Sequence, residues 1–206
     1  FQHIYAFFLY SLSTFFWVLM KDYKKFFQHQ LGGHYRKTFP KKEMFRLFFY
    51  KALYYFMFLA LPILVIDVAW YWVVFGFFLS HLLEGFLVAV IFMLAHIVED
   101  TDFPEPTEEG KMNMPWADLQ LHTTSNFAIN NRVVNYLFGG LNFQVEHHLF
   151  PKVCHVHYPQ IAKIVKQTAK DHNLPYLEQE TFLGAIGSHI RFLKKYGRPE
   201  SSMATS

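Results

Sequence analysis

Side chains able to bind a metal ion are concentrated in residues 141–151, directly after a Gly-Gly pair. If this stretch is helical, Gln144, His147 and His148 stand at positions i, i+3 and i+4 and can share one face. Imidazole is a ligand that suits iron, zinc and copper. Consecutive helical residues also point about 100° apart, so the two histidines could bind two different ions. The spacing therefore predicts a metal-binding helix that the rest of the chain must position.

The apolar first half of the chain indicates membrane helices. The sequence of 206 residues is 52% hydrophobic with 25 Phe, which is too apolar for an ordinary soluble domain. Residues 1–46 combine an apolar membrane or in-plane segment with a basic cytosolic loop, and residues 47–98 suffice for two spans of about 20 residues each. Asp67 and the aromatic residues after it predict the reversal between these spans. No Lys or Arg occurs between Lys51 and Lys111, so the positive-inside rule places both ends of this transmembrane helical hairpin in the cytoplasm.

The rest of the sequence predicts a helical cytosolic cap at residues 99–196, which contains the histidine pair. Apolar residues recur at helical spacing after Pro159 and again over residues 181–196. Residues 197–206 are polar and are predicted to form a disordered tail. The predicted fold is therefore all-α, an integral membrane helical hairpin with a cytosolic helical metal-binding cap. Cys154 is the only cysteine, which excludes an internal disulfide.

A third histidine, His96, ends the second predicted span on the cytoplasmic side, where His147 and His148 are also expected. A histidine at a helix end is as readily a hydrogen-bonded interface residue as a metal ligand, although the acidic residues after it could orient its ring. His81 and Glu84 share a face inside the same span. We expect them to bond each other or a neighbouring helix, because ionisable groups at membrane depth face protein or a polar cavity.

The run Gly-Gly-Leu-Asn-Phe-Gln-Val-Glu-His-His-Leu-Phe-Pro, residues 139–151, resembles the third histidine box of the membrane fatty acid desaturases. Gln144 stands where other branches have the first histidine of the box. In this the sequence is similar to the front-end branch, whose members resemble delta-5 and delta-6 desaturases and bacterial linoleoyl-CoA desaturases. The further matches, spread over nearly the whole chain, are Gln2-His3-Ile4-Tyr5, Leu94-Ala95-His96, Trp116, Gln120, Thr123-Thr124-Ser125-Asn126-Phe127 and Cys154-His155-Val156-His157-Tyr158-Pro159.

The resemblance implies a non-haem di-iron site, two Fe ions held by histidines from three boxes and one extra position. The iron ligands that it implies in this chain are His96, His147 and His148. Gln144 would be a weak ligand or a hydrogen-bond partner of one, Glu146 would orient a neighbouring imidazole, and Asn142 would lie close by. It assigns no further catalytic residue and no substrate-binding residue.

The resemblance also implies a function. The chain would be the C-terminal part of a fatty acyl desaturase that inserts a cis double bond into an acyl-CoA or acyl-lipid, using O2 and two electrons. Ferredoxin or cytochrome b5 would donate the electrons, no nucleic acid would be bound, and the multi-pass membrane protein would carry its active site on the cytoplasmic face. The HxxxH and HxxHH boxes of the family do not occur in these 206 residues. We therefore expect a longer protein, and no activity from this part alone.

The residues leave other functions open. A related membrane hydroxylase or sphingolipid desaturase would share the scaffold and differ in its product. A non-catalytic metal-binding membrane protein or a transporter would lack the upstream boxes in the longer gene. Lys41, Lys42, Arg46 and Lys152 are candidate contacts for a CoA or lipid phosphate, although positive-inside topology is the simpler explanation. No role carries over to His122, which is predicted to be structural.

Overall fold

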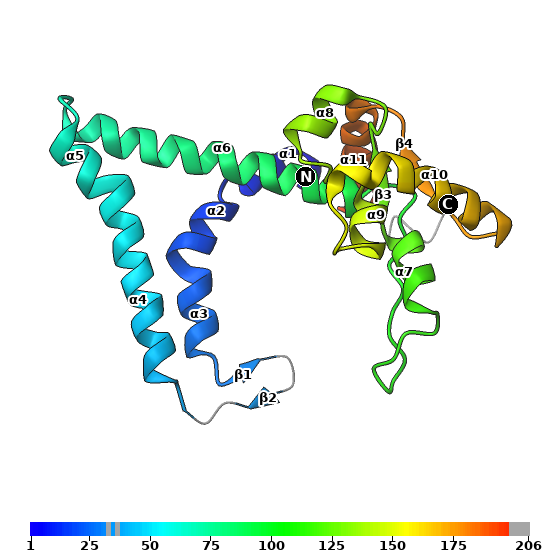
Figure 1. Ribbon diagram of the computed structural model, residues 1–206, viewed down its shortest axis with the longest axis horizontal. Helices are drawn as coiled ribbons and strands as arrows, with labels where there is room; N and C mark the ends of the chain where they lie inside the picture. The colour runs from blue at the N-terminus through cyan, green and yellow to red at the C-terminus, as the bar shows by residue number, and fades with distance from the viewer. Residues whose placement is uncertain (32–33, 36–37, 198–206) are drawn as a thin grey trace. The chain divides into compact units, whose positions relative to one another are not determined.

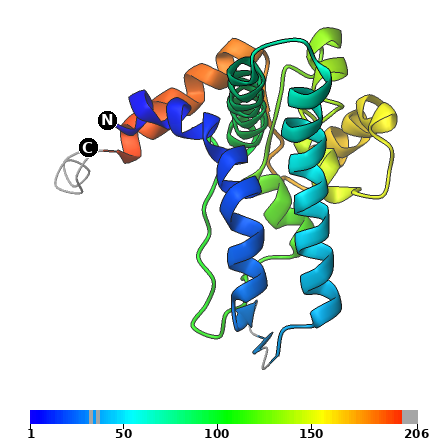
Figure 2. The same cartoon turned by 90° about the vertical axis from the view of Figure 1, so that its left-hand side faces the viewer.

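The computed structural model describes residues 1–31, 34–35 and 38–197. The predicted tail lies outside the described residues apart from Gly197, as does part of the predicted basic loop. Helices dominate the described residues (Figure 1, Figure 2). The chain divides into two compact units. We call Phe7–Ala89 the hairpin unit, and Phe1–Ala6 together with the chain from Val90 onward the cap unit.

The elements follow one another in a simple order. The first ten are α1 (Gln2–Ser11), α2 (Ser13–Phe16), the π-helical turn η1 (Trp17–Lys21), α3 (Asp22–Phe27), β1 (Gln30–Leu31), β2 (His34–Tyr35), α4 (Lys41–Tyr55), the π-helical turn η2 (Phe56–Ala60), α5 (Leu61–Val65) and α6 (Trp70–His96). The later ones are α7 (Trp116–Thr123), β3 (Ser125–Phe127), α8 (Arg132–Leu137), α9 (Gln144–Leu149), the 3-10 turn η3 (His155–His157), α10 (Tyr158–Asp171), β4 (Leu177–Gln179) and α11 (Phe182–Tyr196).

Two helical segments are long and apolar enough to cross a membrane, Lys41–Val65 and Trp70–His96. They meet at a short non-helical link that contains Asp67, where the aromatic pattern predicted the reversal. Many of their large apolar side chains are exposed, as expected of surfaces that face lipid. Within the hairpin unit, α4 and α6 diverge from the link, so the predicted hairpin is open (Figure 1, Figure 2).

The first apolar segment is bent. The helix Gln2–Ser11 and the helix Ser13–Phe27 together pass the same test of length and hydropathy, but they are inclined by 52°. The segment is thus a broken span or a re-entrant loop, where the sequence predicted a membrane or in-plane segment. If it is counted as one span, the described residues hold three.

Polar contacts join the helices of the hairpin unit. Thr14 donates from Oγ1 to the carbonyl oxygen of His81 over 2.7 Å, and Nε2 of His81 lies 2.6 Å from the Tyr54 hydroxyl of α4. His81 therefore bonds a neighbouring helix, as expected, whereas Glu84, of which the same was expected, is exposed. Gly85 permits the close approach of α2 and α6, because a Cβ there would lie 2.5 Å from Oγ1 of Thr14. Lys51 of α4 pairs with Asp22 of α3 at 2.8 Å.

The core of the cap unit forms where α7, α9 and α10 meet. All three helices contribute buried apolar side chains to one cluster, namely Leu121 of α7, Val145 of α9, and Val165 and Ala169 of α10. Beside it, β3 pairs with β4 in parallel, with Asn126 opposite Glu178. The sequence predicted only helices for the cap, and these three-residue strands carry too little periodic signal to be recognised.

The chain just after α6 is fixed by α11, which agrees with the amphipathic helix predicted at residues 181–196. Nδ1 of His189 donates to the carbonyl oxygen of Ile97 over 2.6 Å, and the hydroxyl of Ser188 accepts from the Glu99 backbone N–H over 3.1 Å. Arg191 pairs with the Glu99 carboxylate at 2.8 Å. These contacts hold the end of α6, and with it His96, against the rest of the cap unit.

Candidate functional site

The short helix α9, Gln144–Leu149, carries the histidine pair, and its start is fixed from other elements. The side-chain oxygen of Asn126, in β3, accepts a hydrogen bond from the backbone N–H of Val145 over 2.9 Å. The Asn142 amide donates to Asn135 over 2.6 Å and to the carbonyl oxygen of Phe127 over 3.1 Å. Six residues make a marginal helix alone, so these tertiary bonds decide where the imidazoles point.

The turn before α9 depends on its two glycines. Gly139 and Gly140 have φ of +56° and +76°, values that side chains with a Cβ adopt only at a cost. A Cβ on Gly140 would also lie 2.7 Å from Cβ of His155, whereas one on Gly139 would meet open space. Glycine is therefore needed at position 140 for two reasons, the positive φ and the lack of space for a Cβ beside His155.

Gly140→Ala is expected to lower the free energy of unfolding of the cap by roughly 2–4 kcal/mol, because backbone strain and the collision with His155 add together. Gly139→Ala is the matched control and should lose only about 1–2 kcal/mol, for backbone strain alone. Denaturant unfolding of the purified full-length variants in detergent measures both. Equal losses in the two variants would show that the contact with His155 is not limiting.

The imidazoles of His96 and His148 stack in the cap unit. Their ring centroids are 5.0 Å apart with an interplanar angle of 25°. The ring of His147 lies 6.0 Å from that of His148, and its Nδ1 is 3.3 Å from the hydroxyl of Tyr158. His96 also lines an open groove of about 400 Å³. The structure thus brings together the three histidines nominated from the sequence, with His147 somewhat apart from the stacked pair.

His148 has a polar partner at each ring nitrogen. Nδ1 lies 2.8 Å from Oε1 of Gln120 in α7 and 3.4 Å from the Thr124 hydroxyl. Nε2 lies 3.3 Å from the Gln144 amide nitrogen. Burial, and then the imidazoles of His96 and His147, lower the pKa of His148 to about 4. The ring is therefore neutral at physiological pH, the form in which histidine binds metal ions.

Glu146 belongs to a separate buried network. Its carboxylate accepts from the Tyr176 hydroxyl over 2.9 Å and from the Asn126 amide over 2.8 Å, and its side chain is fully buried. Burial raises the pKa of Glu146 above its usual value. The resemblance predicted that Glu146 orients an imidazole, but the bonds described for its carboxylate go to Asn126 and Tyr176. Its effect on the histidines is thus exerted through the position of α9.

The three histidines offer donors for metal ions but no complete ligand set. Among the described residues, no three His, Cys, Asp or Glu side chains are grouped closely enough to form a ligand set by themselves. The donor chemistry nevertheless fits iron, since His148 is neutral and its Nδ1 is hydrogen-bonded to Gln120, as the second nitrogen of a metal-bound imidazole usually is. Asn142 adds an unusual feature, a fully buried Oδ1 atom without a hydrogen-bond partner. The described residues offer part of a ligand set.

Sequence reasoning missed three residues that contact the box. Tyr158 lies within a matched motif, and Gln120 was matched without a role, so both were visible but unassigned. Tyr176 carried no signal, because its contact with Glu146 spans 30 residues. His122, predicted to be structural, has its Nδ1 2.8 Å from the Asp102 carboxylate.

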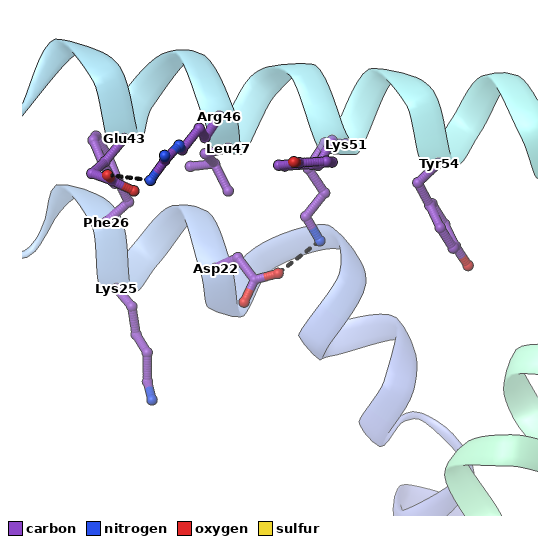
Figure 3. A pocket seen from close by; sticks show the side chains of 9 residues that line it. Asp22, Lys25, Phe26, Glu43, Arg46, Leu47, Lys51 and Tyr54 are labelled. Atoms are coloured by element: carbon purple, nitrogen blue, oxygen red, sulfur yellow. Dashed lines mark hydrogen bonds and ion pairs between the residues drawn. The ribbon is translucent and has the colours of Figure 1, made fainter.

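A groove of about 720 Å³ lies between α3 and α4 in the hairpin unit (Figure 3). The side chains that line it include Arg46, which is one of the candidate phosphate contacts, Lys25 and several apolar residues. The Arg46 guanidinium is already paired with Glu43 at 2.8 Å, and Lys51 with Asp22 at 2.8 Å (Figure 3). Because Arg46 is already paired within the unit, topology remains the simpler explanation for this residue.

Comparison with known proteins gives a consistent result. A family model described as Fatty acid desaturase matches residues 1–180. A "sn-1 linoleoyl-lipid 6-desaturase" of Synechocystis sp. is 37% identical, covering 96% of this chain and 55% of that protein. An "Acyl-lipid (8-3)-desaturase" of Physcomitrium patens is also 37% identical, covering 97% of this chain and 42% of its own length. A second "sn-1 linoleoyl-lipid 6-desaturase", of Arthrospira platensis, is 33% identical, covering 95% and 52%.

The chain thus spans about half the length of these curated relatives. No solved structure matches it.

Proposed function

Because this chain belongs to the fatty acid desaturase family, we propose that the longer protein containing it is a di-iron acyl desaturase of the front-end type. It would insert a cis double bond into the acyl chain of a lipid or a CoA ester. The observation that carries the proposal is the stacking of His96 and His148, 52 positions apart in sequence, at 5.0 Å in a chain that matches the family over residues 1–180.

The proposed iron ligands in this part are His96, His147 and His148, and the remaining ligands would come from boxes that this sequence does not contain. Two iron ions, when bound, supply the oxidant, formed from O2 and two electrons, that an unactivated methylene requires. The chain's own residues orient and support the ligands. Gln120 and Gln144 bond the two nitrogens of His148, and Tyr158 bonds Nδ1 of His147.

The membrane placement follows from the same reasoning. Two helices of the described residues can span a membrane, and a bilayer would hold an acyl substrate beside them. We propose a multi-pass protein whose cap unit, with the histidines, lies at the cytoplasmic face, where the basic residues after α1 also belong. The names of the relatives favour an acyl-lipid substrate over an acyl-CoA. Ferredoxin or cytochrome b5 would supply the electrons.

Product analysis tests this function. The full-length protein, expressed in a host that lacks polyunsaturated fatty acids and fed linoleate, is expected to form a new double bond on the carboxyl side of the existing pair. Gas chromatography with mass spectrometry of the extracted lipids identifies it, and an empty vector is the control. A hydroxylated product, or a desaturated sphingoid base, would favour one of the alternative enzymes. A full-length sequence without HxxxH and HxxHH boxes would contradict a di-iron desaturase.

A further inference from the structure

We propose that Gln120 is a positioning residue, which fixes the tautomer and the direction of the His148 ring so that Nε2 presents its lone pair to a metal ion. The inference rests on the proposed function, since it concerns one of the proposed iron ligands. It gives a role to a side chain outside the histidine box, on α7, 28 residues from its partner.

The two amide side chains around His148 determine its tautomer. Oε1 of Gln120 can only accept, so Nδ1, 2.8 Å away, must carry the proton. The Gln144 amide nitrogen can only donate, so Nε2, 3.3 Å away, must carry the lone pair. The two bonds lie on opposite nitrogens and agree with one tautomer. That tautomer leaves Nε2 as the metal-binding atom, and Gln144 would give up its long bond when a metal ion binds.

Gln120 is held firmly enough to act in this way. It lies in the second turn of α7, followed by Leu121, which is buried in the cluster with Val145 of α9. The Thr123 hydroxyl bonds the carbonyl oxygen of Leu119 over 2.7 Å, which closes the end of the helix. Packing of α7 against α9 thus sets the distance between Gln120 and His148.

The same segment also borders the other stacked ring. Thr123, three residues after Gln120, lines the groove that His96 lines. The end of α7 therefore lies beside both His96 and His148. A hydrogen-bond partner of a metal-bound imidazole typically accounts for 10–100-fold in metal affinity.

The test compares Gln120→Leu, Gln120→Glu and Gln120→Asn in the purified full-length protein. Leu removes the acceptor at similar size, Glu keeps an acceptor oxygen at the same reach, and Asn keeps the amide but is one methylene shorter. The readouts are iron bound per protein and the rate of iron loss to an excess of a chelator. We expect Leu and Asn to lose iron roughly 10–100 times faster than the wild type, and Glu to retain it at close to the wild-type rate.

Each outcome decides a specific point. Iron loss from Gln120→Leu at the wild-type rate would overturn the positioning role. Equal defects in the Glu and Asn variants would do the same, because an acceptor oxygen at the same reach would then give no rescue. If the Leu variant does not fold, the comparison of Glu with Asn still decides. His148→Ala is measured in parallel, and if it keeps its iron, the ligand assignment in the proposed function fails instead.

Discussion

His148→Ala in the full-length protein is expected to abolish desaturation and to lower the bound iron. The ring stacks on His96 at 5.0 Å and has a polar partner at each nitrogen, so no neighbouring imidazole can take over its position. Losing a ligand's hydrogen-bond partner typically lowers metal affinity or activity 10–100-fold, and losing the ligand itself should lower them further. Turnover is therefore expected to fall more than about 100-fold below the wild type. His147→Ala is expected to behave in the same way. Iron analysis and product formation, measured on the same preparation, check both variants.

His122→Ala is the matched control for these histidine variants. Its Nδ1 pairs with the partly exposed Asp102 carboxylate at 2.8 Å, and it belongs to the same unit. A pair that is partly exposed to solvent contributes little to stability, about 0–1 kcal/mol, so iron content and turnover should both be close to wild type. Retention of iron and turnover by the His148 variant would refute its assignment as a ligand. A loss in the His122 variant as large as in the others would indicate a general folding defect.

Asn126→Leu is expected to cause the largest loss of stability in the cap, roughly 3–6 kcal/mol. The amide donates to the buried Glu146 carboxylate and accepts from the Val145 backbone N–H, at 2.8 and 2.9 Å. Leucine has a similar volume but leaves an acid and a backbone donor buried without these partners. Because the lost bonds fix α9, bound iron should fall as well. Unfolding in denaturant, followed by circular dichroism in detergent, measures the change.

Two further variants, each with a smaller expected loss of stability, serve as comparisons for this prediction. Tyr176→Phe removes one hydroxyl donor to Glu146 and leaves Asn126 in place, so the loss should be about 1–3 kcal/mol. Asn130→Leu makes the same chemical change at an exposed position of the same unit and should cost under about 0.5 kcal/mol. A loss in Asn126→Leu no greater than in Asn130→Leu would show that the buried network does not hold α9.

Some features could be read from local sequence because they depend on residues close in the chain. Hydropathy and the aromatic residues around Asp67 predicted two long apolar helices joined near that residue, and the structure has them at Lys41–Val65 and Trp70–His96. The i, i+4 spacing predicted that Gln144 and His148 would meet, and they lie 3.3 Å apart. Helical periodicity also located α11 to within a residue.

What only the tertiary structure decided concerns pairs that lie far apart in sequence. Whether Glu146 would bond an imidazole or a tyrosine depended on where β3 and the segment before β4 pack, and the outcome was Tyr176 and Asn126. Gln120 met His148 because α7 and α9 bury a common apolar face, which no local pattern records. The sequence by itself, through its resemblance to the family, predicted which side chains would bind iron. Long-range packing decided how their rings are turned, because a six-residue helix has no stable orientation without its neighbours.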